Sequence, residues 1–118
     1  MKDEEMIRVM EEHCRKRVID GGERHGQFNP LLDQNNYLEY LLEKLADGMN
    51  YSDMSYMIVV CQHFKKLGEK EMGYIRKELS LLQALLVQSY KITINLNEFL
   101  KKKGVVNNAK EEEKKESD

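Results

Sequence analysis

The feature that most constrains this sequence is a long stretch, residues 36–103, that repeats apolar residues at three- and four-residue steps and contains no proline. Proline breaks helices, and the single proline of the chain, Pro30, precedes this stretch. Glycine commonly stops a helix, and Gly68 falls near the middle. The pattern predicts two helices of about 33 residues, each roughly 50 Å long at 1.5 Å per residue.

Each of these helices carries an inner stripe of mostly apolar residues that we expect to face the other helix. The first stripe comprises Leu38, Leu42, Leu45, Met49, Ser52, Tyr56, Val59 and His63. The second comprises Met72, Ile75, Leu79, Leu82, Leu86, Ser89, Thr93, Leu96 and Leu100. The β-branched segment 92–94 is compatible with a strand, but the helical spacing continues through it. Because the connection at Gly68 is short, we predict an antiparallel helical hairpin.

Both helices also carry apolar residues that point away from the inner stripes. They are Leu41, Ile58, Val60 and Phe64 on the first helix, and Leu81, Leu85, Ile92 and Phe99 on the second. Two helices cannot bury apolar surface on so many sides. The sequence therefore predicts an all-α protein whose hairpins oligomerise into a helical bundle, as a homodimer or a higher homo-oligomer.

A shorter helix is expected at the N-terminus, over about residues 3–19, with Ile7, Met10, Cys14 and Val18 on its apolar side. We expect Gly21-Gly22 to end it. Residues 20–35 then show no clear periodicity, and such a long connection is either functional or a plain surface crossover. The predicted organisation is a single helical domain over residues 1–104 and a disordered, charged tail over 105–118.

Composition excludes several classes of function. Nineteen basic and 21 acidic side chains leave a net charge of −2, which does not favour binding to duplex nucleic acid. No apolar run approaches the ~20 residues that span a membrane, and the acidic N-terminus is unlike a signal peptide, so a cytoplasmic location is expected. Cys14 and Cys61 have no partners at metal-ligand spacing, and we interpret both as small buried hydrophobic residues.

Acidic residues recur along one side of the first long helix. Glu39, Glu43 and Asp47 are four residues apart, and Asn50 continues the row. Carboxylates one turn apart are suitable ligands for Mg²⁺, although the same spacing is typical of a solvated acidic surface. Gly48 is unfavourable inside a helix by about 1 kcal/mol relative to alanine, so we expect a backbone or a ligand to come close there.

The hairpin should bring residues of the second long helix level with this acidic row. Tyr90 and Lys91 are expected opposite Asp47, beside the polar inner-stripe residues Ser89 and Thr93. Carboxylates, a lysine and a tyrosine together suit a metal-bound phosphorylated ligand. The alternative is a hydrogen-bonded layer that specifies how the oligomer assembles. Zinc-protease, dinucleotide and phosphate-loop motifs are absent, and no serine or cysteine has the context of a nucleophile, so no catalytic residue is assigned.

Two segments resemble a known family. Residues 24–30, Arg-His-Gly-Gln-Phe-Asn-Pro, and residues 43–51, Glu-Lys-Leu-Ala-Asp-Gly-Met-Asn-Tyr, are similar to the MazG-like proteins. These are all-α nucleoside-triphosphate pyrophosphohydrolases with small phage and bacterial members, and the resemblance covers about residues 22–55. It implies a dimeric or tetrameric bundle in which acidic residues hold Mg²⁺ and an activated water releases pyrophosphate. Glu43 and Asp47 match metal-ligand positions of the family, whereas Lys44 stands where a second acidic residue is usual.

Three functions remain open at this point. The first is a Mg²⁺-dependent nucleotide pyrophosphohydrolase with Glu43 and Asp47 as metal ligands. The second is a related non-catalytic bundle that sequesters a nucleotide, such as a signalling nucleotide, which Lys44 favours because lysine repels a metal ion and attracts phosphate. The third is a small helical protein that binds or inhibits another protein through its exposed stripes. The candidate ligand-binding residues are Arg24, His25, Phe28, Asn50, Tyr51, Tyr90 and Lys91.

Overall fold

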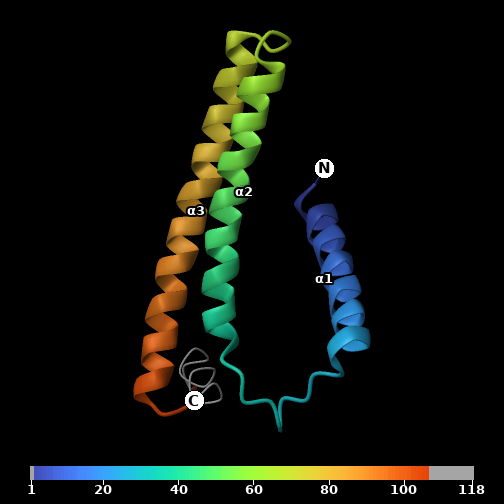
Figure 1. Ribbon diagram of the computed structural model, residues 1–118, viewed down its shortest axis with the longest axis vertical. Coiled ribbons are helices and arrows are strands. Elements are labelled where there is room, and N and C mark those ends of the chain that lie inside the picture. The colour runs from blue at the N-terminus through green and yellow to red at the C-terminus, as the bar shows by residue number, and fades with distance from the viewer. Residues whose placement is uncertain (1, 107–118) are drawn as a thin grey trace. The chain divides into compact units, whose positions relative to one another are not determined.

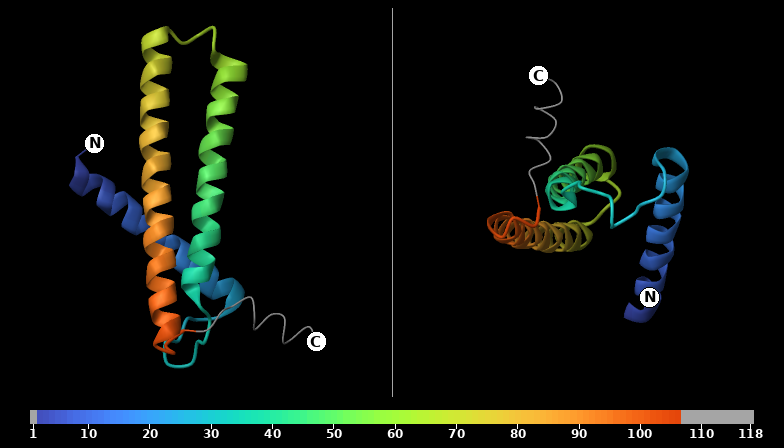
Figure 2. Two further views of the ribbon diagram at one scale, coloured as in Figure 1. Left: turned by 90° about the vertical axis from the view of Figure 1, so that its left-hand side faces the viewer. Right: turned by 90° about the horizontal axis from the view of Figure 1, so that it is seen from below.

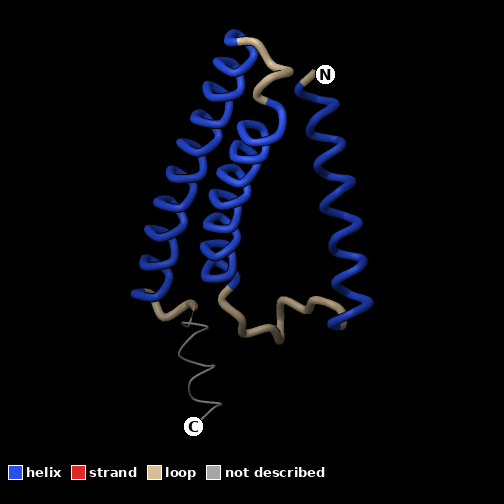
Figure 3. The backbone as a smooth tube through the Cα atoms, turned by 45° about the horizontal axis from the view of Figure 1, so that its top comes forward, coloured by secondary structure: helices blue, strands red, loops and turns tan. Residues whose placement is uncertain are grey.

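The computed structural model describes residues 2–106, apart from the side chains of Arg24 and His25. Over these residues it contains three helices, α1 (Asp3–His25), α2 (Tyr37–His63) and α3 (Glu69–Lys102), and no strand (Figures 1 and 3). The all-α prediction is therefore confirmed, including helical structure through residues 92–94. No helix in this part of the chain combines the length and the apolar character that a membrane crossing requires.

The first helix is longer than the sequence predicts. α1 continues through Gly21 and Gly22 to His25, so the predicted end at the glycine pair is wrong. Glycine tolerates helical torsion angles at a cost of about 1 kcal/mol, and a glycine ends a helix when it leaves the helical conformation. That residue is Gly26, which has a φ of 88° and donates its N–H to the carbonyl of Gly22 at 3.0 Å.

The segment between α1 and α2 contains one tight turn. The backbone N–H groups of Leu32 and Asp33 both donate to the carbonyl of Asn29, and the Asn29 side chain accepts from the N–H of Leu31 at 3.1 Å. The sequence predicts the start of α2 near residues 33–36, and the helix begins at Tyr37, where the side chain of Asn36 caps it by accepting from the N–H of Leu38 at 3.2 Å. The irregular connection therefore covers residues 26–36 instead of 20–35.

α2 and α3 pack along each other in all views (Figures 1 and 2). Side-chain hydrogen bonds join Asn36 to Asn97 and Ser52 to Gln83. The beginning of α2 thus lies beside the end of α3, and the turn between His63 and Glu69 connects their other ends.

Two backbone hydrogen bonds close the end of α3 around Gly104. The N–H of Val105 donates to the carbonyl of Leu100, and the N–H of Gly104 donates to that of Lys101, each at 3.0 Å. Gly104 has a φ of 70°. This pair of bonds with a left-handed glycine is the Schellman motif, which satisfies carbonyl groups that the last turn leaves free.

The chain divides into two compact units, Met1–Asp33 and Gln34–Asp118, and each is described by itself. A single domain over 1–104 remains a prediction, and the predicted tail lies outside the described residues from position 107 onward. In the described part of the second unit, Met72 is the only hydrophobic residue that is fully buried, whereas Asn36, Ser52, Thr93 and Asn97 are buried polar residues.

The inner stripe of α2 is confirmed, since all eight of its members are buried or half-buried. The stripe of α3 is correct only in part. Leu82, Ser89 and Leu96 are exposed, while their neighbours Gln83 and Asn97 are half-buried and buried. The strict heptad set of Met72, Leu79, Leu86, Thr93 and Leu100 stays on the contacting side. The second position of the heptad lies one residue later than predicted, at Gln83 and Asn97, because the steps of three and four residues alternate in the other order.

Candidate functional site

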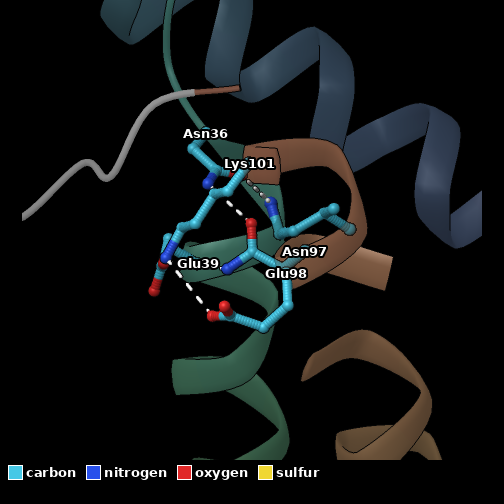
Figure 4. A network of polar contacts seen from close by, with 6 residues as sticks. Asn36, Glu39, Asn97, Glu98 and Lys101 are labelled. Carbon is cyan, nitrogen blue, oxygen red and sulfur yellow. Dashed lines mark hydrogen bonds and ion pairs between the residues drawn. The ribbon is translucent and has the colours of Figure 1, made fainter. Parts of the chain in front are cut away.

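A polar cluster ties the start of α2 to the end of α3 (Figure 4). The amide of Asn36 donates to Asn97 Oδ1 at 2.8 Å, and Asn97 Nδ2 donates to Glu39 Oε1 at 2.8 Å. Lys101 Nζ lies 2.7 Å from the same Glu39 oxygen and 3.8 Å from Glu98. Asn36 and Asn97 are each only 2% exposed, so these bonds replace water almost completely. The buried polar atoms of this cluster therefore all have partners, and the cluster holds the two helices together at this end.

Beyond Glu39, the acidic row of α2 lies in a different environment. Glu43, Asp47 and Asn50 are all exposed. The amine of Lys44 lies 4.0 Å from a carboxylate oxygen of Asp47, with half or more of each side chain exposed. A surface pair of this kind contributes about 0–1 kcal/mol and opens easily. Among the described residues, no three or more acidic, histidine or cysteine side chains gather as metal ligands. Glu43 and Asp47 therefore offer two ligands, and a cation there would also need water or phosphate oxygens.

The remaining predicted ligand-binding residues are spread over both units. Phe28 lies in the connection after α1, in the first unit, and is 65% exposed. The side chains of Arg24 and His25 lie outside the described residues. In the second unit, Tyr51, Tyr90 and Lys91 are exposed. That these residues form one pocket with Asp47 remains a prediction.

The surroundings of Gly48 leave room for a Cβ atom. A Cβ atom at this position would lie 3.4 Å from a methyl carbon of Leu86 on α3. Next to this contact, a hollow of about 120 Å³ is lined by Leu45, Ala46, Met49, Leu86, Val87 and Tyr90. The atoms nearest to such a Cβ belong to a side chain at ordinary van der Waals distance and not to another backbone, so the structure shows no close backbone approach at Gly48. The hollow at this level is apolar except for Tyr90.

A second hollow, of about 240 Å³, lies closer to the turn. It is lined by Asp53, Tyr56, Arg76, Leu79, Ser80 and Gln83. Gln83 Nε2 donates to Ser52 Oγ at 2.9 Å and to Asp53 Oδ1 at 2.6 Å, and the Ser52 hydroxyl donates to the carbonyl of Met49. These hydrogen bonds give the buried Ser52, a polar member of the inner stripe of α2, both a donor and an acceptor partner.

Both cysteines differ from their prediction. Cys14 and Cys61 are free thiols and are exposed, so their interpretation as buried hydrophobic residues is wrong. Cys61 follows Met57 and Ile58 on a part of α2 where these side chains are also exposed. An apolar stripe indicates which side of a helix is apolar, but it does not establish that another element covers that side.

The polar cluster is not predicted by any pattern in the sequence. Glu39 belongs to the predicted acidic row, whereas no sequence pattern pairs Asn36, Asn97 or Lys101 with the other helix. Asn97 lies one residue beside the predicted stripe position Leu96. The available signal was a polar residue next to an inner-stripe position, which becomes meaningful only when the alignment of the two helices is known.

Comparisons of the chain with protein-family models, with curated proteins and with solved structures yield no match.

Proposed function

We propose that this chain is a helical interaction module, in which an antiparallel hairpin of α2 and α3 assembles with a second copy into a larger bundle. The observation that carries the proposal is the apolar side of α3 that α2 does not cover. Leu81, Leu85, Ile92 and Phe99 each expose 55–64% of their surface.

The burial within the hairpin supports this proposal. Two helices bury one stripe each, and in the described part of the hairpin only Met72 among the hydrophobic residues is fully removed from water. Fully burying a leucine-sized side chain contributes about 1.5–3 kcal/mol, so the exposed residues represent a large stabilisation that the isolated hairpin does not gain. Packing two hairpins into a four-helix bundle supplies the missing cover.

The test is the mass of the protein in solution, measured by size-exclusion chromatography with light scattering. We expect a dimer or a higher oligomer for the wild type and a shift to monomer for Leu85→Glu. A two-fold interface would contain the change twice, so the affinity should fall by a factor of about 100 or more. Ala84→Glu is the matched control, because Ala84 is exposed next to Leu85 but outside the apolar side. A monomeric wild type, or equal behaviour of the two variants, would reject the proposal.

A second candidate is binding of a nucleotide, with or without Mg²⁺-dependent release of pyrophosphate as in MazG-like proteins. It is supported by the exposure of Glu43 and Asp47 on one side of α2, where water and phosphate have access. The Lys44–Asp47 ion pair adds a cation for phosphate and opposes a metal ion. On this proposal, Glu43 and Asp47 hold Mg²⁺, and Lys44 and Lys91 contact phosphates.

The test is a thermal-shift screen with nucleoside triphosphates, cyclic nucleotides and Mg²⁺, followed by an assay for pyrophosphate. A ligand at about 100 times its Kd stabilises the folded state by about 2.7 kcal/mol. Asp47→Asn should abolish the shift, whereas Glu71→Gln, an exposed acidic residue of α3, should retain it. Lys44→Glu should strengthen Mg²⁺ binding. If no nucleotide shifts the transition, or if both acidic variants behave alike, this candidate fails.

A further inference from the structure

The uncovered side of α3 has a regular spacing. Tyr74, Leu81, Leu85, Ile92 and Phe99, here called the outer stripe, follow one another at steps of seven, four, seven and seven residues. All five are more than half exposed. Buried Met72, Thr93 and Asn97, which lie on the side of α2, fall on the opposite side of the helix. Steps that are whole heptads or parts of heptads are the pattern with which one helix packs along another.

We infer that the occupant of the outer stripe is α3 of a second copy of this chain, aligned antiparallel. This inference rests on the proposed self-assembly and adds the contact surface and the alignment. Four members of the stripe pair with one another in this arrangement, while Leu85 lies opposite Gln88 beside the two-fold axis and therefore close to Leu85 of the other copy. Tyr74 of one copy lies opposite Phe99 of the other, and Leu81 lies opposite Ile92, so that a pair of aromatic residues closes each end. The alignment also places Glu78 opposite Asn95.

Charge distribution selects the antiparallel alignment over the parallel one. In a parallel pair, Lys102 and Lys103 of one copy would meet the same lysines of the other, and Glu69 and Glu71 would also meet their equivalents. In the antiparallel pair, the basic last turn of each α3 lies near the acidic first turn of the other. Opposite charges and opposed helix dipoles then both favour the arrangement.

Disulfide cross-linking between Glu78→Cys and Asn95→Cys tests the alignment. Both residues are exposed and lie among the outer-stripe residues, so the substitutions remove no apolar contact. The two positions are about 25 Å apart along one helix, whereas a disulfide requires Cα atoms within about 7 Å. The exposed thiols of the wild type are first removed as Cys14→Ser and Cys61→Ser.

Each single variant is oxidised alone. In a separate sample, the two reduced variants are mixed, allowed to exchange subunits and then oxidised. Mass spectrometry identifies the cross-linked products. If the pair is antiparallel, a 78–95 link forms in the mixture. Random exchange makes half of the dimers mixed, so up to about half of the chains should be linked. Each variant alone should show little self-linking. Ser80→Cys mixed with Lys91→Cys is the control, since both residues are exposed and lie away from the outer stripe.

The outcomes separate the inference from the proposed function. A monomer in solution with no cross-link rejects both. An oligomer that gives 78–78 and 95–95 links is parallel and overturns the alignment alone. An oligomer without links at these positions, or with equal linking in the control pair, has its interface elsewhere and also overturns the inference while self-assembly stands.

Discussion

Replacing Asn97 by alanine should destabilise the hairpin far more than its position near the end of α3 suggests. The side chain is 2% exposed and makes two bonds of 2.8 Å, accepting from Asn36 and donating to the carboxylate of Glu39. A neutral hydrogen bond contributes about 0.5–1.5 kcal/mol and one to a charged group about 1.5–3 kcal/mol. Alanine favours the helix by about 0.5 kcal/mol over asparagine, which offsets a part.

The expected net loss is therefore about 1.5–4 kcal/mol in the free energy of unfolding. For a domain of this size, 1 kcal/mol corresponds to roughly 4–8 °C in Tm, so a decrease of about 6–30 °C is expected. Urea unfolding followed by circular dichroism at fixed protein concentration measures the loss. The control is Ser89→Ala, an exposed polar residue of the same helix whose truncation brings a similar gain in helix propensity.

The double variant Asn36→Ala with Asn97→Ala makes the test specific. If the two side chains stabilise the fold through their mutual bond, the second substitution costs less than it does alone, with a coupling energy of about 0.5–3 kcal/mol. Two results would refute the conclusion that the polar cluster holds the start of α2 to the end of α3. One is strict additivity of the two losses in unfolding free energy, and the other is a loss for Asn97→Ala no larger than that for Ser89→Ala.

Three further measurements have expected outcomes. Lys101→Ala removes the 2.7 Å ion pair with Glu39, whose side chain is 14% exposed, and should lower the free energy of unfolding by about 1–3 kcal/mol. The control Lys102→Ala should change it by less than about 0.5 kcal/mol. Equal effects of the two substitutions would contradict the partial burial of the pair. Gly104→Ala should destabilise the protein by about 1 kcal/mol because φ is 70° there. Gly73→Ala, in the second turn of α3, should stabilise it by a similar amount, because an added Cβ there meets nothing within 4 Å. Thermal unfolding measures both changes, and the same sign for both would be inconsistent with this backbone. Cys14 and Cys61 should both react with a thiol reagent in the native protein, and a titre of less than two thiols per chain would show that one of them is covered.

The long helices were predictable because their signals are local. Repeats at three and four residues, the capping residue Asn36 and the left-handed glycine Gly104 each act within a few residues along the chain. The end of α1 was missed for a related reason. A glycine pair can stay helical, and local sequence does not distinguish Gly21-Gly22, which stay in the helix, from Gly26, which leaves it.

The contacts of the polar cluster were not predictable in the same way. Asn36 and Asn97 are 61 residues apart, and their bond exists only in one alignment of α2 on α3. An error of one residue in the inner stripe of α3 was enough to choose Leu96 as the buried residue in place of Asn97. The exposure of Cys14 and Cys61 was missed because it depends on which sides of the helices are covered, and the pattern along one helix does not contain that information.

Apolar stripes alone would leave the alignment of α2 and α3 poorly defined. One leucine-sized side chain can take the place of another after a shift of seven residues, so apolar contacts specify the alignment of two helices less strictly than polar contacts do. Hydrogen bonds between side chains do not tolerate this shift, because a buried amide without its partner loses about 1–3 kcal/mol. Asn36–Asn97 at one end and Ser52–Gln83 near the middle are compatible with the same alignment. These polar pairs therefore help to determine the register between α2 and α3, and neither of them uses a residue of the outer stripe of α3.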